Sequence, residues 1–260
     1  MENNCLNCNC VITENFCGNC GQKKYNRINK KYIVDELQYS LLHTNKGFLY
    51  SVKNILKNPG ETARDFINGN RVNHYKPILL AFMLSGISAF ISYKVIGLNT
   101  IMKEMYAEKQ MYADTMNDFL SFAGSYNSFM MLLLIPIFAV FTITVFGKWG
   151  QNYYEHVVMN AYILSYYTIT NIIIVYPLLY FFRHDLDVFI PITVLAILVI
   201  PFILVWFFKG FYKEKSLKSI ILRILLLIGL LIIAYIVIIF AIVFLYLLLK
   251  GPEGLKQFSR

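Results

Sequence analysis

The chain has 260 residues, of which 57% are apolar, 16% aromatic and only 15% charged, and its mean hydropathy is +0.54. This composition excludes an ordinary water-soluble globular protein. The formal charge of +9 is concentrated near the N-terminus, where residues 22–76 hold eleven Lys and Arg against four acidic residues. The first 20 residues lack the apolar core of a signal peptide, so we expect the mature protein to begin at or near Met1.

Four cysteines near the N-terminus form two Cys-x2-Cys pairs, Cys5 with Cys8 and Cys17 with Cys20. Two such pairs on tight turns can place four thiolates in a tetrahedron, the geometry of structural zinc sites. About twenty residues cannot bury a core, so the metal would supply the folding free energy. The spacing predicts a zinc ribbon over residues 1–22. Iron in the same cage and a pair of disulfides are the alternatives, and Cys10 is left over.

A basic juxtamembrane segment follows over residues 23–76. It opens with five cations that we expect to contact anionic lipid head groups: Lys23, Lys24, Arg27, Lys30 and Lys31. Each such cation contributes about 1 kcal/mol near a membrane surface. Zinc ribbons also occur in nucleic-acid-binding proteins, but beside a membrane anchor lipid contact is the commoner meaning of such a run, so nucleic acid is the less favoured partner.

The rest of this segment has helical patterns too short to span a membrane. Apolar residues at helical spacing predict two amphipathic helices between residues 32 and 56, lying on the membrane surface or packed under the bundle. Asn58-Pro59-Gly60 is expected to end the second one. Thr62 with Asp65 then predicts a short helix that opens in a capping box and ends at Gly69.

Five apolar segments are long enough to cross a bilayer about 30 Å thick. They cover residues 77–98, 128–147, 157–182, 188–208 and 220–249. They predict an all-α membrane bundle over residues 77–249, followed by a short tail at 250–260. On the first segment Ala81, Ser85 and Ala89 recur every fourth residue, which favours close approach of another helix.

Lys and Arg are unevenly divided between the two sides of this bundle. The head, the loop at 148–156 and the region at 209–223 carry 17 of them, leaving seven for the opposite side. The positive-inside rule therefore predicts a cytoplasmic N-terminus, and a reducing compartment favours metal over disulfides. The cations of the tail would then lie outside, so a four-span or re-entrant arrangement stays open.

Polar residues follow one face of the third predicted span. They are Glu155, His156, Asn160, Tyr167 and Asn171. Such groups need partners in hydrocarbon, so they are expected to face the bundle interior. They could act in proton transfer or metal binding, but interhelical hydrogen bonding is favoured, since no nucleophile, second carboxylate or known catalytic motif accompanies them. The sequence predicts no catalytic residue.

Three groups of short motifs stand out along the chain. They are FCGNCGQ at 16–22, PGET with FINGNR and YKP between 59 and 77, and YYEHVV at 153–158. Together they resemble a bacterial family of multi-span membrane proteins known only as a domain of unknown function, and the resemblance covers most of the chain. It implies an N-terminal zinc ribbon, a place in the bacterial inner membrane and no established activity.

Two functions fit these observations. The first is a membrane-anchored interaction, regulatory or scaffold protein, whose zinc ribbon docks a cytoplasmic protein. The second is a small-solute or ion transporter, or a channel, on spans two to four, with the Glu155 to Asn171 face along its path. Homo-oligomerisation is left open, and a membrane-embedded enzyme ranks third because a catalytic set is missing.

Overall fold

The computed structural model describes residues 4–24, 27–33, 47–108 and 113–250. Within these ranges the secondary structure is helical, apart from two isolated β-bridges near the N-terminus. Five helical segments are long and apolar enough to cross a membrane: Pro77–Ile96, Phe129–Trp149, Tyr153–Phe181, Leu186–Phe211 and Leu217–Ala241. With the cysteine cluster at the N-terminus, they confirm the predicted fold class.

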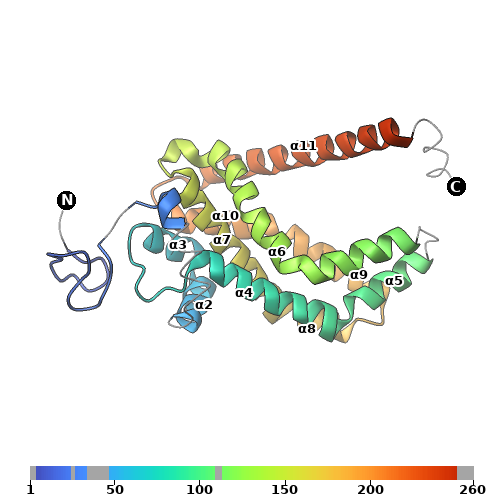
Figure 1. Cartoon of the computed structure of the whole chain (residues 1–260), viewed down its shortest axis with the longest axis horizontal. Coiled ribbons are helices and arrows are strands. Elements are labelled where there is room, and N and C mark those ends of the chain that lie inside the picture. Colours follow the sequence, from blue (N-terminus) through green and yellow to red (C-terminus); the bar gives the residue numbers. More distant parts are fainter. Residues whose placement is uncertain (1–3, 25–26, 34–46, 109–112, 251–260) are drawn as a thin grey trace.

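The elements are, in chain order, α2 (Phe48–Lys57), α3 (Pro59–Ile67), α4 (Pro77–Phe90), η1 (Ile91–Ile96), α5 (Leu98–Glu108), α6 (Ala113–Phe146), η2 (Gly147–Trp149), α7 (Tyr153–Thr170), η3 (Asn171–Val175), α8 (Tyr176–Phe181), α9 (Leu186–Leu198), α10 (Ile200–Phe211) and α11 (Leu217–Lys250). The cysteine-containing ribbon, residues 4–24, lies beyond the end of the bundle where α4 and α7 begin (Figure 1). We call this the ribbon end, and the opposite one, where α8 ends and α9 begins, the far end.

The first three spans form the centre of the bundle, because α4, α6 and α7 each pack against the other two. Small residues from all three helices meet there, with Ala81, Ala139 and Ala161 in one buried cluster. Small side chains let helix backbones approach closely, which is a main source of helix association in membranes.

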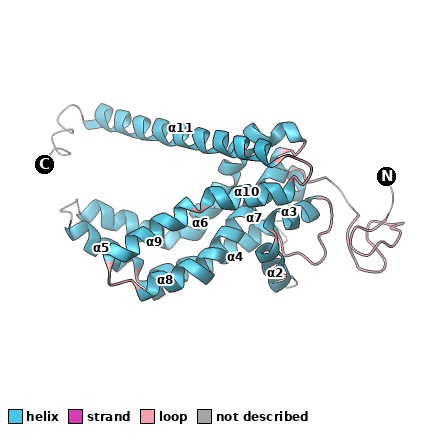
Figure 2. Cartoon of the chain, turned by 180° about the vertical axis from the view of Figure 1, so that it is seen from behind, coloured by secondary structure: helices cyan, strands magenta, loops and turns pink. Residues whose placement is uncertain are grey.

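The fourth span is interrupted and the fifth leaves the bundle. Val199 separates α9 from α10, and Pro201 stands just after it, where its missing N–H removes a helical hydrogen bond. α11 packs against α6 and α10 near its start. Both views show its later turns diverging from the other spans (Figure 2). Long apolar side chains there are exposed, Phe240 at 71%, as expected of a lipid-facing helix.

At the ribbon end, Arg223 of α11 packs against aromatic side chains from α6, η2 and the end of α10. Phe146 stacks on Phe208 with ring centroids 4.0 Å apart, and Trp149 meets Tyr212 edge-on at 4.6 Å. The Arg223 guanidinium lies 4.4 Å from the Trp149 ring and donates to the Val145 carbonyl. Aromatic and cationic side chains gathered in this way are typical of the boundary between a membrane and water.

Two short helices, α2 and α3, lie between the ribbon and the spans. Ile55 of α2 is fully buried, while Leu49 on the same helix is 79% exposed. α3 packs against α7 and α10 and buries most of its residues. The first of the two predicted amphipathic helices falls largely on residues 34–46, which lie outside the described residues.

The predicted start of α3 is wrong. Thr62 does not open the helix; instead Asn58 caps it, because its side-chain oxygen accepts a hydrogen bond from the Glu61 N–H at 3.1 Å. Pro59 occupies the first helical position, where a missing N–H costs nothing. The Asn-Pro-Gly sequence, which predicts a helix stop, therefore also serves as a helix start.

The motif Pro59-Gly60-Glu61-Thr62 brings α3 into direct backbone contact with α10. A Cβ added at Gly60 would lie 1.9 Å from the Phe207 carbonyl oxygen, and one at Gly210 would lie 2.4 Å from the Asn58 side chain. Ion pairs between Glu61 and Lys213 and between Arg64 and Glu214 flank this crossing. The two glycines therefore fix how the juxtamembrane helix sits on the fourth span.

Candidate metal centre and intramembrane cavity

The four cysteines of the ribbon converge on one point. Their sulfur atoms all lie within 4.8 Å of one another, and Cys5–Cys20 and Cys8–Cys17 are each 3.5 Å apart. Tetrahedral zinc with Zn–S bonds of about 2.3 Å places its sulfur ligands about 3.8 Å apart. The four thiols therefore fit one tetrahedral metal ion, and Cys10 is exposed and outside the group.

The two cysteine turns have the same backbone geometry. In the first, the Asn9 N–H donates to the Cys5 carbonyl, and in the second the Gly21 N–H donates to the Cys17 carbonyl. Asn9 and Gly21 both have positive φ, at 59° and 71°. A left-handed residue after the second cysteine of each pair turns the chain so that both thiols point inward, and Asn and Gly tolerate this conformation best.

The ribbon has almost no apolar core of its own. Ile12 is the single buried side chain that packs with the four cysteines. Three apolar side chains instead point outward: Leu6 is 53% exposed, Val11 66% and Phe16 57%. A metal ion bound by the four cysteines would hold the shape of a module this small, and the exposed apolar residues are free to contact another molecule.

Several contacts attach the ribbon to the juxtamembrane helices. The buried Gln22 amide donates to the carbonyl of Gly69, just after α3, and Asn73 donates to Asn7 at 3.2 Å. Ile28, just after the ribbon, is fully buried in the main apolar core with Phe66 and Phe207. The ribbon is thus held against the bundle.

Arg27 reaches a residue 128 positions away in the sequence. Its guanidinium bonds both carboxylate oxygens of Glu155, at 3.1 and 3.2 Å, and the Gly150 carbonyl at 2.7 Å. Asn152 accepts a hydrogen bond from the Glu155 N–H and donates to the Ile28 carbonyl. The start of α7 is therefore both capped and joined to the segment that follows the ribbon.

The other four predicted lipid-contact residues are exposed. Lys23 and Lys24 belong to the ribbon, and Lys30 and Lys31 lie in the segment that follows it. Lipid contact of these residues stays a prediction. Arg27 differs from them because it is paired with the carboxylate of Glu155.

The polar face predicted on the third span is divided between two places. At the ribbon end, His156 is fully buried, and Asn160 donates to the His156 carbonyl and to the Thr142 hydroxyl of α6. Nearer the far end, Tyr167 and Asn171 line a cavity, and the Asn171 amide donates to the Tyr167 carbonyl at 2.9 Å. Glu155 and Asn171 thus lie in different environments.

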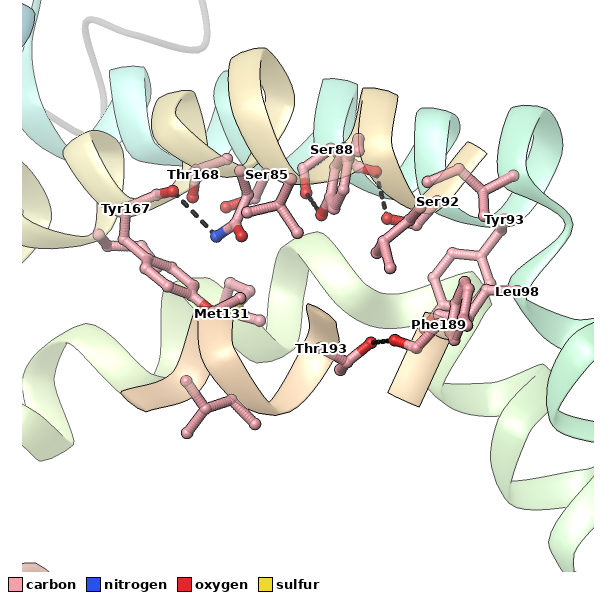
Figure 3. A pocket seen from close by; sticks show the side chains of 18 residues that line it. Ser85, Ser88, Ser92, Tyr93, Leu98, Met131, Tyr167, Thr168, Phe189 and Thr193 are labelled. Atoms are coloured by element: carbon pink, nitrogen blue, oxygen red, sulfur yellow. Dashed lines mark hydrogen bonds between the residues drawn. The ribbon is translucent and has the colours of Figure 1, made fainter. Parts of the chain in front are cut away.

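This cavity has a volume of about 290 Å³ and lies between the first four spans. Half of its 18 lining residues carry a hydroxyl or an amide. They are Ser85, Ser88, Ser92, Tyr93, Tyr167, Thr168, Asn171, Tyr176 and Thr193. Figure 3 shows Ser85, Ser88 and Thr168 on one wall, with Thr193 of α9 facing them from the other.

Two π-helical turns form part of the cavity wall. η1 contributes Ser92, and η3 begins at Asn171 and is followed by Pro177. A proline lacks the N–H that would continue the regular ladder, and π-helical turns occur frequently at functional sites. Ser88 and Tyr176 join the two spans through a hydroxyl pair at 2.6 Å.

Sequence reasoning missed most of the hydroxyl groups of this cavity. Ser85, Ser88 and Ser92 lie at positions i, i+3 and i+7, so one face of the first span carries all three. That spacing could have been recognised. Tyr176 and Thr193 carry no such signal, because only the packing of α8 and α9 brings them to the cavity.

His74 lies outside the spans, between α3 and α4. The rings of Tyr50 and Phe66 meet it edge-on at centroid distances of 5.2 and 6.1 Å. Burial lowers the pKa of His74 to about 4, so the side chain is neutral at pH 7. It acts as a packing residue at the junction of the juxtamembrane helices and the first span.

Comparisons with known proteins identify one matching family. The sequence model of a family described as "Protein of unknown function (DUF3667)" matches residues 45–89. The described part of this match comprises α2, α3 and most of α4, and it includes the glycine that contacts α10. Comparison with curated proteins gives no match, and neither does comparison with solved structures.

Proposed function

We propose that this is a membrane-anchored interaction protein whose zinc-bound ribbon docks a cytoplasmic protein. One observation carries the proposal: the metal-binding ribbon is fixed to the bundle through Gln22 and the Arg27–Ile28 segment, yet exposes Leu6, Val11 and Phe16. Exposed apolar side chains on a small rigid module are typical of a protein-binding surface.

The position of the ribbon favours a protein partner over lipid for these three residues. α2 and α3 lie between the ribbon and the spans, so the ribbon is held beyond the bundle rather than beside it (Figure 1). The exposed lysines, closer to the bundle in sequence, are the better candidates for contact with anionic lipid head groups.

Location and metal follow from the same physical reasoning. We infer from the excess of Lys and Arg at the ribbon end that this end faces the cytoplasm, and the resemblance to a bacterial family supports an inner membrane. In a reducing compartment, four converging thiols bind a metal rather than form disulfides, and zinc is the commonest ion in such structural cages.

The test is site-specific photo-crosslinking in living cells. A photoreactive residue replaces Val11 in one variant and Glu14, an exposed polar position on the same ribbon, in the control. We expect a single protein adduct from position 11, little from position 14, and loss of the adduct when Cys17→Ser is added. Lipid adducts, or protein adducts unaffected by Cys17→Ser, would contradict the proposal.

A second candidate is transport of a small solute or an ion, and the uncharged cavity among the first four spans favours a neutral solute. Flux measured in proteoliposomes separates it from docking. Asn171→Leu should reduce flux with membrane insertion unchanged, while Val11→Ser should leave flux intact. Glu155→Gln tests whether the path extends to the ribbon end.

A further inference from the structure

The cavity contains a buried hydroxyl group without a hydrogen-bond partner. Ser85 is only 2% exposed, and its Oγ has no partner among the described residues. Serine in a membrane helix usually bonds a carbonyl of its own helix, as Ser92 does to Ser88 and Ser165 does to Ala161. A buried hydroxyl without a partner is energetically unfavourable, and a ligand with a polar group could provide the missing hydrogen bond.

The lining restricts the charge of an occupant. None of the 18 lining residues is charged. A charged group buried in a membrane interior without a counter-charge is strongly disfavoured. The cavity therefore suits a neutral group that both donates and accepts hydrogen bonds, because its walls carry hydroxyls and amides that do the same.

The other half of the lining is apolar, and one wall borders the lipid. Ile96, Leu179 and Phe189 line the cavity and belong to one buried apolar cluster. Ile197 lines the cavity yet is 55% exposed, so the α9 side is open toward the lipid-facing surface. A volume of about 290 Å³ holds a small polar head but not a whole lipid, so an acyl chain would have to leave past α9.

We propose that this cavity is a binding site for a neutral, hydroxyl-bearing amphiphile of the acylglycerol type, whose glycerol hydroxyls bond Ser85, Asn171 and Tyr176. The proposal concerns binding alone, so it holds whether or not the ribbon docks a protein. The hydroxyl groups could come from a membrane lipid or from a free polyol, which the experiment distinguishes.

The full-length protein in detergent is titrated with radiolabelled 1-monooleoylglycerol, with glycerol, and with methyl oleate, which has the same chain but no hydroxyl. The cavity variant combines Ser85→Ala with Tyr176→Phe. The matched control combines Ser165→Ala with Tyr180→Phe, the same chemical changes on α7 and α8 outside the cavity. Thr193→Val serves as a second cavity variant. Thr193 lies on the largely exposed helix α9, so removal of its hydroxyl group leaves the core of the bundle intact.

We expect saturable binding of monooleoylglycerol, at least tenfold weaker in the cavity variant and unchanged in the control, and no saturable binding of methyl oleate. The same pattern with glycerol but not with the lipid would identify a free polyol as the source and also support the site. Equal binding by methyl oleate, equal weakening in the control, or no saturable binding of either hydroxyl-bearing probe would overturn the proposal. Should the double variant not fold, Thr193→Val decides in the same way, with a several-fold weakening expected.

Discussion

The ribbon and the ribbon end of the bundle adjoin each other but hold their shapes in opposite ways. The bundle buries large side chains such as Phe66, Tyr162 and Phe207, and two helices cross there at backbone distance. In the ribbon the buried apolar cluster consists of Ile12 with Cys5 and Cys17, and Cys8 and Cys20 pack against it partly buried. Apolar packing therefore specifies the bundle, and metal coordination by the four cysteines would specify the ribbon, so each region should unfold under a different perturbation.

Metal removal should give the largest effect and act on the ribbon alone. Structural zinc contributes on the order of 10–16 kcal/mol to folding of comparable small modules. Chelation or Cys8→Ser should abolish hydrogen-exchange protection of the Cys17 and Gly21 amides, which bond within the second cysteine turn. Protection in α7 and α10 should persist. Concerted loss in both regions would show that the ribbon and the bundle fold as one unit.

Gly60→Val should destabilise the bundle and spare the ribbon. A Cβ there meets the Phe207 carbonyl oxygen at 1.9 Å, so α3 and α10 must separate. We expect the free energy of unfolding to fall by about 3 kcal/mol, which is the upper part of the usual range for overpacking a core. Thermal unfolding in detergent measures it. Gly229→Ala on α11 is the control, since nothing lies within 4 Å of a Cβ there. Equal effects of the two would contradict the close crossing.

Acidification should weaken the bundle through His74. Its folded-state pKa of about 4 lies below the unfolded value near 6.5, so the unfolded chain binds more protons between these values. Stability is therefore lost as pH falls from 6.5 toward 4, by about 2 kcal/mol at pH 5. His74→Phe should remove this part of the pH dependence of the melting temperature. An unchanged pH profile would mean that His74 is protonated in the folded protein.

The link between the two regions should give the smallest effect. The Arg27–Glu155 pair joins a side chain that is 57% exposed to one that is 5% exposed. A double-mutant cycle with Arg27→Gln and Glu155→Gln should give a coupling of about 1 kcal/mol, and Lys30→Gln with Glu155→Gln should give none. The readout is the thermal stability of the metal-bound protein. A coupling near zero for Arg27 would remove this contact from the attachment of the ribbon.

Local patterns predicted much of this structure. The cysteine spacing indicates the metal cage because each pair forms its turn through hydrogen bonds within six residues. Apolar segment length indicates five spans because the bilayer sets the length of a helix. Arg27, in contrast, looks like its neighbouring lysines in sequence, and only the fold places it against Glu155. The cavity was missed for the same reason, since its hydroxyl groups come from three different spans, the first, third and fourth.

The docking proposal requires the ribbon to face the cytoplasm, and Cys10 offers the most direct test. This thiol is exposed and does not belong to the group of four cysteines. Its labelling therefore depends on whether the reagent can reach the ribbon, and not on whether a metal ion is bound. A membrane-impermeant maleimide should leave Cys10 unlabelled in intact cells, label it in opened cells, and label Asp187→Cys, an exposed position at the far end, in intact cells. Labelling of Cys10 in intact cells, with Asp187→Cys protected, would contradict the orientation and with it a cytoplasmic partner for the ribbon.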